Sequence, residues 1–156
     1  MVLGTNMNNG IQLRNNVERW LIHENYSFKA VKSIEDSFRM LIKDNGSFKI
    51  PIEIFEPKAQ PGVLVLGSKV FLRNPQTARY NKLTDSEREK FKNSVKDFCN
   101  SIRAIHKIFK EDGKVVIGVY LVLDKIEQFT QGNVLEALGQ VTEMSEKIYQ
   151  FINKTF

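Results

Sequence analysis

A run of nine apolar or glycine residues, Val115–Leu123, ends on Asp124. Enzymes with parallel α/β sheets place catalytic or metal-binding carboxylates at the ends of such buried strands. Here Asp112-Gly113, just before the run, is a pair typical of a tight hairpin turn between antiparallel strands. We therefore interpret Asp124 as a turn or capping residue, a role in which Asp is common.

A second candidate for chemistry is the segment Val63–Ser68, which has the form of a strand that delivers Gly67 to a phosphate-binding loop. A dinucleotide fingerprint needs three spaced glycines, and a P-loop needs Gly-Lys-Ser/Thr after four free positions. Neither pattern is present, and Val70–Leu72 resumes the extended run. The pattern predicts a β-bulge at Gly67.

Metal and nucleophile chemistry have little support. His23 and His106 stand alone, without the ligand spacing to Cys99 that a zinc site needs. Cys99 lies on the apolar face of a predicted helix, where an inert buried thiol is the common case, and no nucleophile motif occurs. Acidic pairs fall in expected turns, where solvation is their ordinary role: Glu35/Asp36 and Glu111/Asp112. We expect no catalytic residues, no metal and no cofactor.

The basic residues form the next candidate site. A net charge of +5 and a sequence pI near 9.3 favour anionic partners. Three cations recur every four residues on one helix face and two arginines precede them: Arg88, Lys92, Lys96, Arg73 and Arg79. Such a stripe tracks phosphates in nucleic-acid-binding proteins. Glu89 and Asp97 border it, and a solvated helix face is the alternative interpretation.

The helix that carries this stripe has a defined start and an apolar face. Thr84 followed by Glu87 predicts a capping box. Apolar positions recur at steps of four, three and four: Phe91, Val95, Phe98 and Ile102. These side chains either cover one face of a sheet or form a dimer or partner surface.

Periodicity also places the N-terminal elements. A first helix follows from one apolar stripe, Leu13, Val17, Trp20 and Leu21, and should end near Glu24–Asn25. Alternating apolar residues then predict strands at 26–32, 38–43, 48–54 and 63–72. Asn45-Gly46 is a hairpin signal, and Pro51 indicates that the third strand lies at an edge or carries a bulge. Residues 1–10 are expected to be disordered, and 11–156 to form a single α+β domain.

The C-terminal half is expected to begin with a connector at 73–83, which shows no apolar period. The second helix should end near Arg103–Ala104 and be followed by a strand at 105–110, although a helix continuing to about 109 is the alternative. A strand at 114–123 and a helix capped by Asn133, with Glu136 at the box position, complete the chain. The predicted fold class is α+β, an antiparallel sheet with helices on one face, in the order α-β-β-β-β-α-β-β-α.

The same features indicate a compartment. One cysteine suits a reducing environment, and the N-terminus has no Lys or Arg before its short apolar start, unlike a secretory signal. The longest apolar run is less than half of a membrane-spanning helix. We expect a cytoplasmic protein that does not enter a membrane.

The order of elements resembles the bacterial type III secretion chaperone fold and its YbjN-like relatives. The resemblance is carried by Trp20-Leu21 leading into Tyr26-Ser27-Phe28, the hairpin Lys110–Lys114, the run ending at Asp124 and the helix opening at Gly132–Glu136. The Lys-, Ile- and Asn-rich composition is also similar to an uncharacterised archaeal family of this size. The resemblance implies a small homodimer that binds other polypeptides.

The leading hypothesis is therefore a non-enzymatic protein-binding or chaperone-like adaptor that acts as a homodimer. Its partners would be a second copy and an unidentified protein. One alternative is a nucleic-acid-binding protein that uses the basic helix face. The other is a small-ligand enzyme whose site is assembled from distant residues that carry no recognisable motif.

Overall fold

The structure is a computed structural model that describes residues 9–43, 46–101 and 104–156. Four α-helices accompany one sheet: α2 (Asn9–His23), α3 (Asn74–Asn81), α4 (Asp85–Ser101) and α5 (Gln131–Thr155), with a short 3-10 turn, η1 (Ile126–Gln128), before the last of them. Most of the segment expected to be disordered, residues 1–8, lies outside the described residues, and Asn9 and Gly10 already belong to α2.

One antiparallel sheet of six strands organises the described chain. Its strands are β1 (Phe28–Ala30), β2 (Asp36–Ile42), β3 (Ile52–Pro57), β4 (Leu64–Phe71), β5 (Ile105–Glu111) and β6 (Lys114–Leu123). Their order across the sheet is β1-β2-β3-β4-β6-β5, with antiparallel pairing throughout. The predicted fold class and the antiparallel sheet are thus confirmed.

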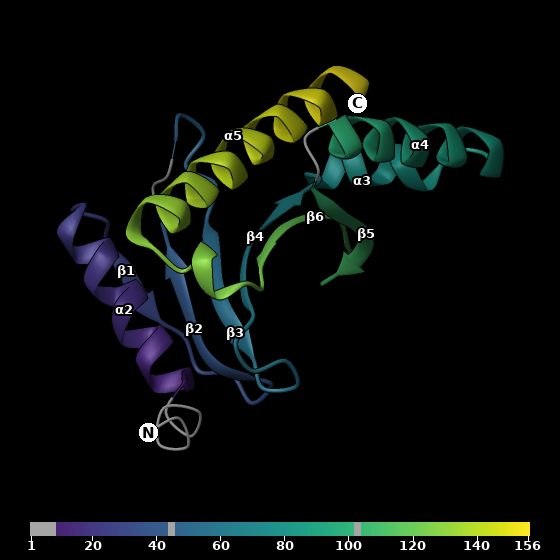
Figure 1. Ribbon diagram of the computed structural model, residues 1–156. Helices are drawn as coiled ribbons and strands as arrows, with labels where there is room; N and C mark the ends of the chain where they lie inside the picture. The colour runs from purple at the N-terminus through teal and green to yellow at the C-terminus, as the bar shows by residue number, and fades with distance from the viewer. Residues whose placement is uncertain (1–8, 44–45, 102–103) are drawn as a thin grey trace.

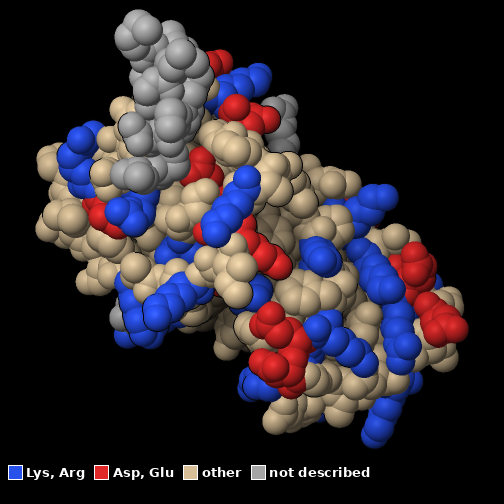
Figure 2. All heavy atoms as spheres, turned by 90° about the horizontal axis from the view of Figure 1, so that it is seen from below, with Lys and Arg blue, Asp and Glu red and all other residues tan. Residues whose placement is uncertain are grey.

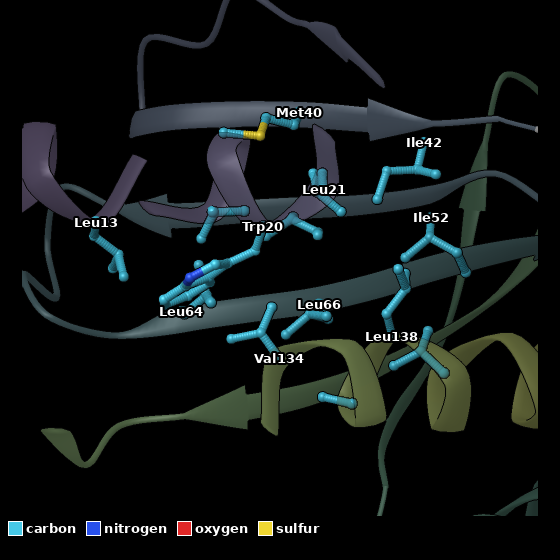
Figure 3. Close-up of a cluster of buried hydrophobic side chains, with 14 of the residues drawn as sticks. Leu13, Trp20, Leu21, Met40, Ile42, Ile52, Leu64, Leu66, Val134 and Leu138 are labelled. Atoms are coloured by element: carbon cyan, nitrogen blue, oxygen red, sulfur yellow. The ribbon is translucent and has the colours of Figure 1, made fainter. Parts of the chain in front are cut away.

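All four helices lie on the same face of the sheet, as predicted, with α5 running across it and α2 and α4 at its two ends (Figure 1). Side chains alternate across each strand, so every second residue points toward the helices. Near α2 and the start of α5, a cluster of buried aliphatic side chains together with Trp20 fills this space (Figure 3): Leu13, Leu21, Met40, Ile42, Ile52, Leu64, Leu66, Val134 and Leu138. Burial of such side chains contributes about 1.5–3 kcal/mol each.

A second cluster joins α3, α4 and the C-terminal half of α5 to β4 and β6. Phe91 of α4 lies at its centre, with its ring 5.9 Å from that of Phe151 and 5.2 Å from that of Phe156. Tyr80 of α3 meets Phe91 edge-on at 5.6 Å. These aromatic contacts attach α3 and α4 to the end of α5.

Several local predictions are confirmed. α2 ends at His23, and Asn25 takes a positive φ of 62° just beyond it. The backbone N–H of Thr84 donates to Glu87 and the N–H of Glu87 donates to the Thr84 hydroxyl, which is the expected capping box of α4. Ala104 precedes the strand β5, so the helix does not continue to residue 109. Asp112 and Gly113, with φ of 52° and 76°, form the hairpin turn between β5 and β6.

Other predictions are wrong for identifiable reasons. The segment 73–83 contains the helix α3, which begins with Pro75 in its first turn, where the missing N–H costs nothing. β3 lies inside the sheet between β2 and β4, and the register shift in the β2–β3 ladder falls between Asp36 and Phe38, at the end of β3 away from Pro51. Pro51 precedes β3, so its missing donor removes no ladder bond and marks neither an edge nor this bulge. The alternation at 48–54 placed the start of β3 too early, since residues 46–49 form turns. The expected Asn45-Gly46 turn lies partly outside the described residues.

Two further corrections concern single residues. The register of β4 with β3 and with β6 is continuous through Gly67, so there is no bulge at this glycine. α5 begins earlier than expected, because the hydroxyl of Thr130 accepts from the N–H of Asn133 and caps the helix. Asn133 instead donates from its side chain to the carbonyl of Glu127.

Candidate functional site: the open face of the sheet

The helices leave the opposite face of the sheet uncovered, and we call this surface the open face. On β4, for example, Leu64 and Leu66 point toward the helices, whereas Gly67 and Lys69 point away from them. The open face therefore consists of the alternate residues of β2 to β6. None of the four described helices lies on this face (Figure 1).

The ring of Tyr120 lies flat over two glycines at the centre of the open face. Gly67 faces Tyr120 across the β4–β6 ladder, and Gly118 precedes it by two residues on β6. A Cβ atom on Gly67 would lie 2.7 Å from Cε1 of the ring, and one on Gly118 would lie 2.6 Å from the hydroxyl oxygen. The Tyr120 ring fits against Gly67 and Gly118 only because these residues carry no side chain.

A hollow of about 240 Å³ lies beside this ring, and we call it the sheet-face hollow. Gly67 belongs to its lining beneath the Tyr120 ring, and three aromatic side chains surround the hollow: Phe55, Phe109 and Tyr120. Four charged side chains also line it: Arg39, Glu53, Lys69 and Lys107. It is smaller than the 300–1,000 Å³ that is typical of pockets for drug-sized ligands, so it suits one compact group.

Ion pairs hold most of these charges in place. Arg39 donates from Nε to Asp36 at 2.9 Å and from Nη1 to Glu53, and its guanidinium lies 4.1 Å above the ring of Phe55. Lys69 donates to Glu111 at 2.8 Å. The exposed Lys107, 5.5 Å from the centre of the Phe109 ring, has no carboxylate partner within the described residues. One rim cation is thus available to a ligand.

Exposed apolar side chains flank the hollow at both ends. Phe71 is 40% exposed beside Val116, while Val122 and Ile105, at 37% and 57%, lie next to Tyr120. Seen from below, away from α5, the molecule shows Lys and Arg interspersed with Asp, Glu and uncharged surface (Figure 2). The exposed apolar side chains thus lie on either side of the hollow, with charged side chains between and around them.

The predicted anion-binding residues are only partly available. Arg79 donates to the backbone oxygen of Phe156, and Arg88 donates to the carbonyls of Tyr80 and Asn81 at the end of α3. The other three are exposed on the surface: Arg73, Lys92 and Lys96. Arg79 and Arg88 therefore form hydrogen bonds within the chain, and the five cations do not converge on one concave site.

The predicted dimer or partner surface on α4 is largely internal. Phe91 and Val95 are 5% and 1% exposed, packed in the cluster under α5, and Phe98 is half-buried beside them. Ile102 lies outside the described residues. The apolar face of α4 thus covers the sheet, which was the other of the two interpretations of this pattern.

Of the side chains considered for chemistry, Asp36 and Cys99 are buried and Asp124 is exposed. The buried carboxylate of Asp36 accepts from the hydroxyl of Ser33 at 2.6 Å and from Arg39. Burial raises the pKa of the Cys99 thiol to about 11, so it stays protonated. Asp124 is exposed at the end of β6. No group of three or more His, Cys, Asp or Glu side chains that could hold a metal ion occurs in residues 9–43, 46–101 and 104–156.

One buried carboxylate is incompletely bonded. Glu56, fully buried at the end of β3, accepts from the N–H of Gly62 at 2.7 Å through Oε2. Its Oε1 has no partner in the described part of the chain. The bond to Gly62 fixes the turn between β3 and β4, which gives this side chain a structural role.

The residues of the sheet-face hollow were not selected from the sequence. Their signal was present, because Phe55, Lys69, Lys107, Phe109 and Tyr120 all occupy the positions between the core residues of their strands. Alternation alone shows that a second face exists and says nothing about whether another layer covers it. The hollow also depends on strand order, which brings β5 and β6 beside β4.

Residues 13–152 match a protein-family model described as "Uncharacterized conserved protein (DUF2299)". The chain belongs to this family. A crystal structure of an uncharacterised protein from Methanothermobacter thermautotrophicus is similar over 92% of this chain and 99% of the other, with a TM-score of 0.78 and 12% identity. At that identity the likeness shows a shared fold, which agrees with the expected uncharacterised archaeal relatives.

None of the curated proteins compared with the chain matches it. The expected likeness to type III secretion chaperones and YbjN-like proteins is not among the matches. Within the described helices of this DUF2299 protein, none has the length and apolar character to cross a membrane.

Proposed function

We propose that this DUF2299 protein is a non-enzymatic binding module and that its open face contacts a polypeptide partner. The supporting observation is the group of exposed apolar side chains on that face, Phe71, Ile105 and Val122, around a hollow lined by three aromatic rings. Apolar side chains exposed to water favour association with another apolar surface.

The charge pattern favours a polypeptide over nucleic acid. Arg39 and Lys69 are already paired with carboxylates on the open face, which leaves Lys107 as its free rim cation within the described residues. Nucleic-acid binding draws its affinity from several cations that neutralise phosphates. The cations on the helix face support this second candidate less, because Arg79 and Arg88 are engaged inside the chain.

The homodimer stays a prediction, and its interface would have to lie on a surface other than the apolar face of α4. Phe91 and Val95 lie in the core of one chain, so a second copy would have to meet exposed residues instead. Light scattering at micromolar concentration tests this part independently of the open face. A cytoplasmic location likewise stays a prediction from the single cysteine.

Affinity capture with surface variants tests the function. Tagged wild-type protein is used to capture partners from its host's nuclease-treated lysate, beside Ile105→Glu, Val122→Glu and a control variant, Lys92→Ala, on exposed α4. We expect one or two stoichiometric proteins that the two glutamate variants lose and the control retains. Proteins that bind all four forms equally, or that disappear with nuclease treatment, would contradict the proposal.

A further inference from the structure

We propose that the sheet-face hollow receives an aromatic side chain of the partner polypeptide, at a residue flanked by Asp or Glu. This inference rests on the proposed function, because it names the chemistry that the open face recognises. It commits to one kind of occupant among several that a sheet face could take: a peptide segment, a second copy or a nucleic-acid strand.

The shape of the hollow selects one large, flat side chain. Its volume is about 240 Å³, and the Tyr120 ring, which covers Gly67, forms part of its wall. Phe55, Phe109 and Tyr120 offer ring faces and edges around it. Aromatic pairs contribute about 0.5–1.5 kcal/mol beyond the area they bury, so these walls favour an aromatic guest over an aliphatic one.

The charges around the hollow select the flanking residues. Three cations and one carboxylate line it, and two of the cations are already paired, Arg39 with Glu53 and Lys69 with Glu111. Lys107 projects at the rim without a carboxylate partner among the described residues. An acidic residue next to the aromatic guest would meet this ammonium group, whereas a basic residue there would meet a like charge.

A second copy fits this rim poorly. Each copy carries a net charge of +5 and would bring its own unpaired Lys107 to the same region of a face-to-face pair. Like charges brought together in this way disfavour the contact. An acidic segment of another protein has the complementary charge.

The test uses short peptides and ¹⁵N-labelled protein. The probe is a blocked peptide with the sequence Gly-Asp-Trp-Asp-Gly, and its controls replace both Asp by Asn, both Asp by Lys, or Trp by Ala. Single-stranded oligothymidylate is titrated separately. Amide shifts of Gly67, Gly118 and Tyr120 report on the hollow, and the amides of α4 around Lys92 serve as a distant reference.

We expect the Asp-Trp-Asp peptide to move the hollow amides and leave the reference amides in place. Exchange of Asp for Asn should weaken binding about two- to fivefold, the effect of one exposed ion pair, and Lys107→Ala should remove this preference. Loss of the Trp ring should weaken binding about tenfold or more. The Lys92→Ala variant should bind as the wild type does.

The outcomes separate this inference from the proposed function. Peptides that move the open-face amides without regard to Asp or Trp would overturn the inference and leave a peptide-binding face. If no peptide moves those amides, or if only oligothymidylate does, both the inference and the polypeptide partner are contradicted. Binding to the α4 reference amides would also overturn the assignment.

Discussion

The ring of Tyr120 occupies the space that a side chain on Gly67 would need. A Cβ atom there would lie 2.7 Å from Cε1 of the ring, closer than real Cβ contacts. Because Gly67 and Tyr120 face each other across the β4–β6 ladder, neither backbone can move away without breaking the register. The flat ring and the bare strand beneath it therefore depend on each other, and together they shape the open face.

Gly67→Ala should lower the free energy of unfolding by about 1–3 kcal/mol, because the new methyl group overpacks against the ring. In a strand without this contact, Ala would instead be the more stable residue. Urea unfolding followed by circular dichroism measures the difference. Tyr120→Ala in the same chain should remove the penalty, with a coupling energy of about 0.5–3 kcal/mol.

A matched control for this prediction is Gly139→Ala on α5. Apart from the surrounding backbone of α5, no atom of the described residues lies within 4 Å of the Cβ position at Gly139, so the substitution should raise stability by about 0.5–1 kcal/mol through helix propensity. If Gly67→Ala is stabilising to the same extent, the ring does not lie over Gly67 in solution and the proposed hollow loses its shape.

Phe91→Ala should destabilise the monomer and leave the oligomeric state unchanged. The ring is 5% exposed and contacts Tyr80, Phe151 and Phe156, so its removal should cost about 3–5 kcal/mol. The neighbouring Lys92→Ala is exposed and should change stability by no more than about 0.5 kcal/mol. Thermal unfolding and light scattering on the same samples give both quantities.

Phe91→Leu keeps this experiment informative if the alanine variant does not fold, because it removes less volume. A Phe91 variant with unchanged stability and a lower mass in solution would contradict the core assignment. That result would restore α4 as an interface between copies.

The sequence predicted those elements whose apolar period reflects a single covered face. The stripe of α2 and the alternation of β2 belong to this class, because one face of each packs on the core and the other is more exposed. The preference of Asn and Gly for positive φ angles also predicted where α2 ends, at Asn25, and where the turn between β5 and β6 lies, at Asp112-Gly113. Here local preference and tertiary packing agree.

α3 escaped prediction because its buried face is polar. Gln76 and Thr77 are buried, and their polar groups form hydrogen bonds with residues distant in the sequence. The Gln76 amide donates to Asn153, and the Thr77 hydroxyl accepts from the N–H of Val115. A helix held by such bonds has no apolar stripe to detect. Pro75 in its first turn was the local signal that it offered.

The open face escaped prediction for a different reason. The alternation of β4 and β6 shows two faces, and only the three-dimensional path of the helices determines which of them remains uncovered. The glycine signal at Gly67 was present and was misinterpreted as a bulge, since the ring above it comes from a residue 53 positions later in the sequence. Strand order is needed to bring that pair together.

Cys99 should be unreactive toward thiol reagents in the folded protein. The side chain is fully buried on α4, and desolvation raises its pKa to about 11, so little thiolate exists at pH 8. Labelling with a chromogenic disulfide at increasing urea should follow the unfolding transition seen by circular dichroism. Fast labelling without urea would show that the face of α4 opens readily.

The same pKa predicts a loss of stability in base. The unfolded thiol ionises at its ordinary pKa, and the folded thiol only near 11, so the proton bound by the folded state stabilises it below both values. This contribution should disappear as the pH rises toward 11. The difference in unfolding free energy between wild type and Cys99→Ala isolates it, because other basic groups titrate in both proteins. A difference that stays constant from pH 8 to pH 11 would contradict it.

The capping box of α4 predicts a pH dependence at the acid end. The hydrogen bond from the Thr84 backbone N–H to the carboxylate of Glu87, and to a smaller extent the hydrogen bond of this carboxylate with the Thr84 side chain, hold the pKa of Glu87 below its ordinary value. The charged carboxylate therefore stabilises the helix above its unfolded pKa, and this contribution is lost as the pH falls through the folded pKa. Glu87→Gln should remove the pH-dependent part of this stabilisation.

Thr84 offers the matched pair of variants for this last prediction. Thr84→Ala should lower the unfolding free energy by about 1 kcal/mol, whereas Thr84→Ser keeps the hydroxyl cap and should lower it much less. Unfolding free energies of wild type and Glu87→Gln, measured from pH 7 to pH 3, should differ by a constant amount near neutrality and converge in acid. A gap that persists at pH 3 would mean that the Glu87 carboxylate contributes through packing and not through its charge, because protonation would then have removed nothing.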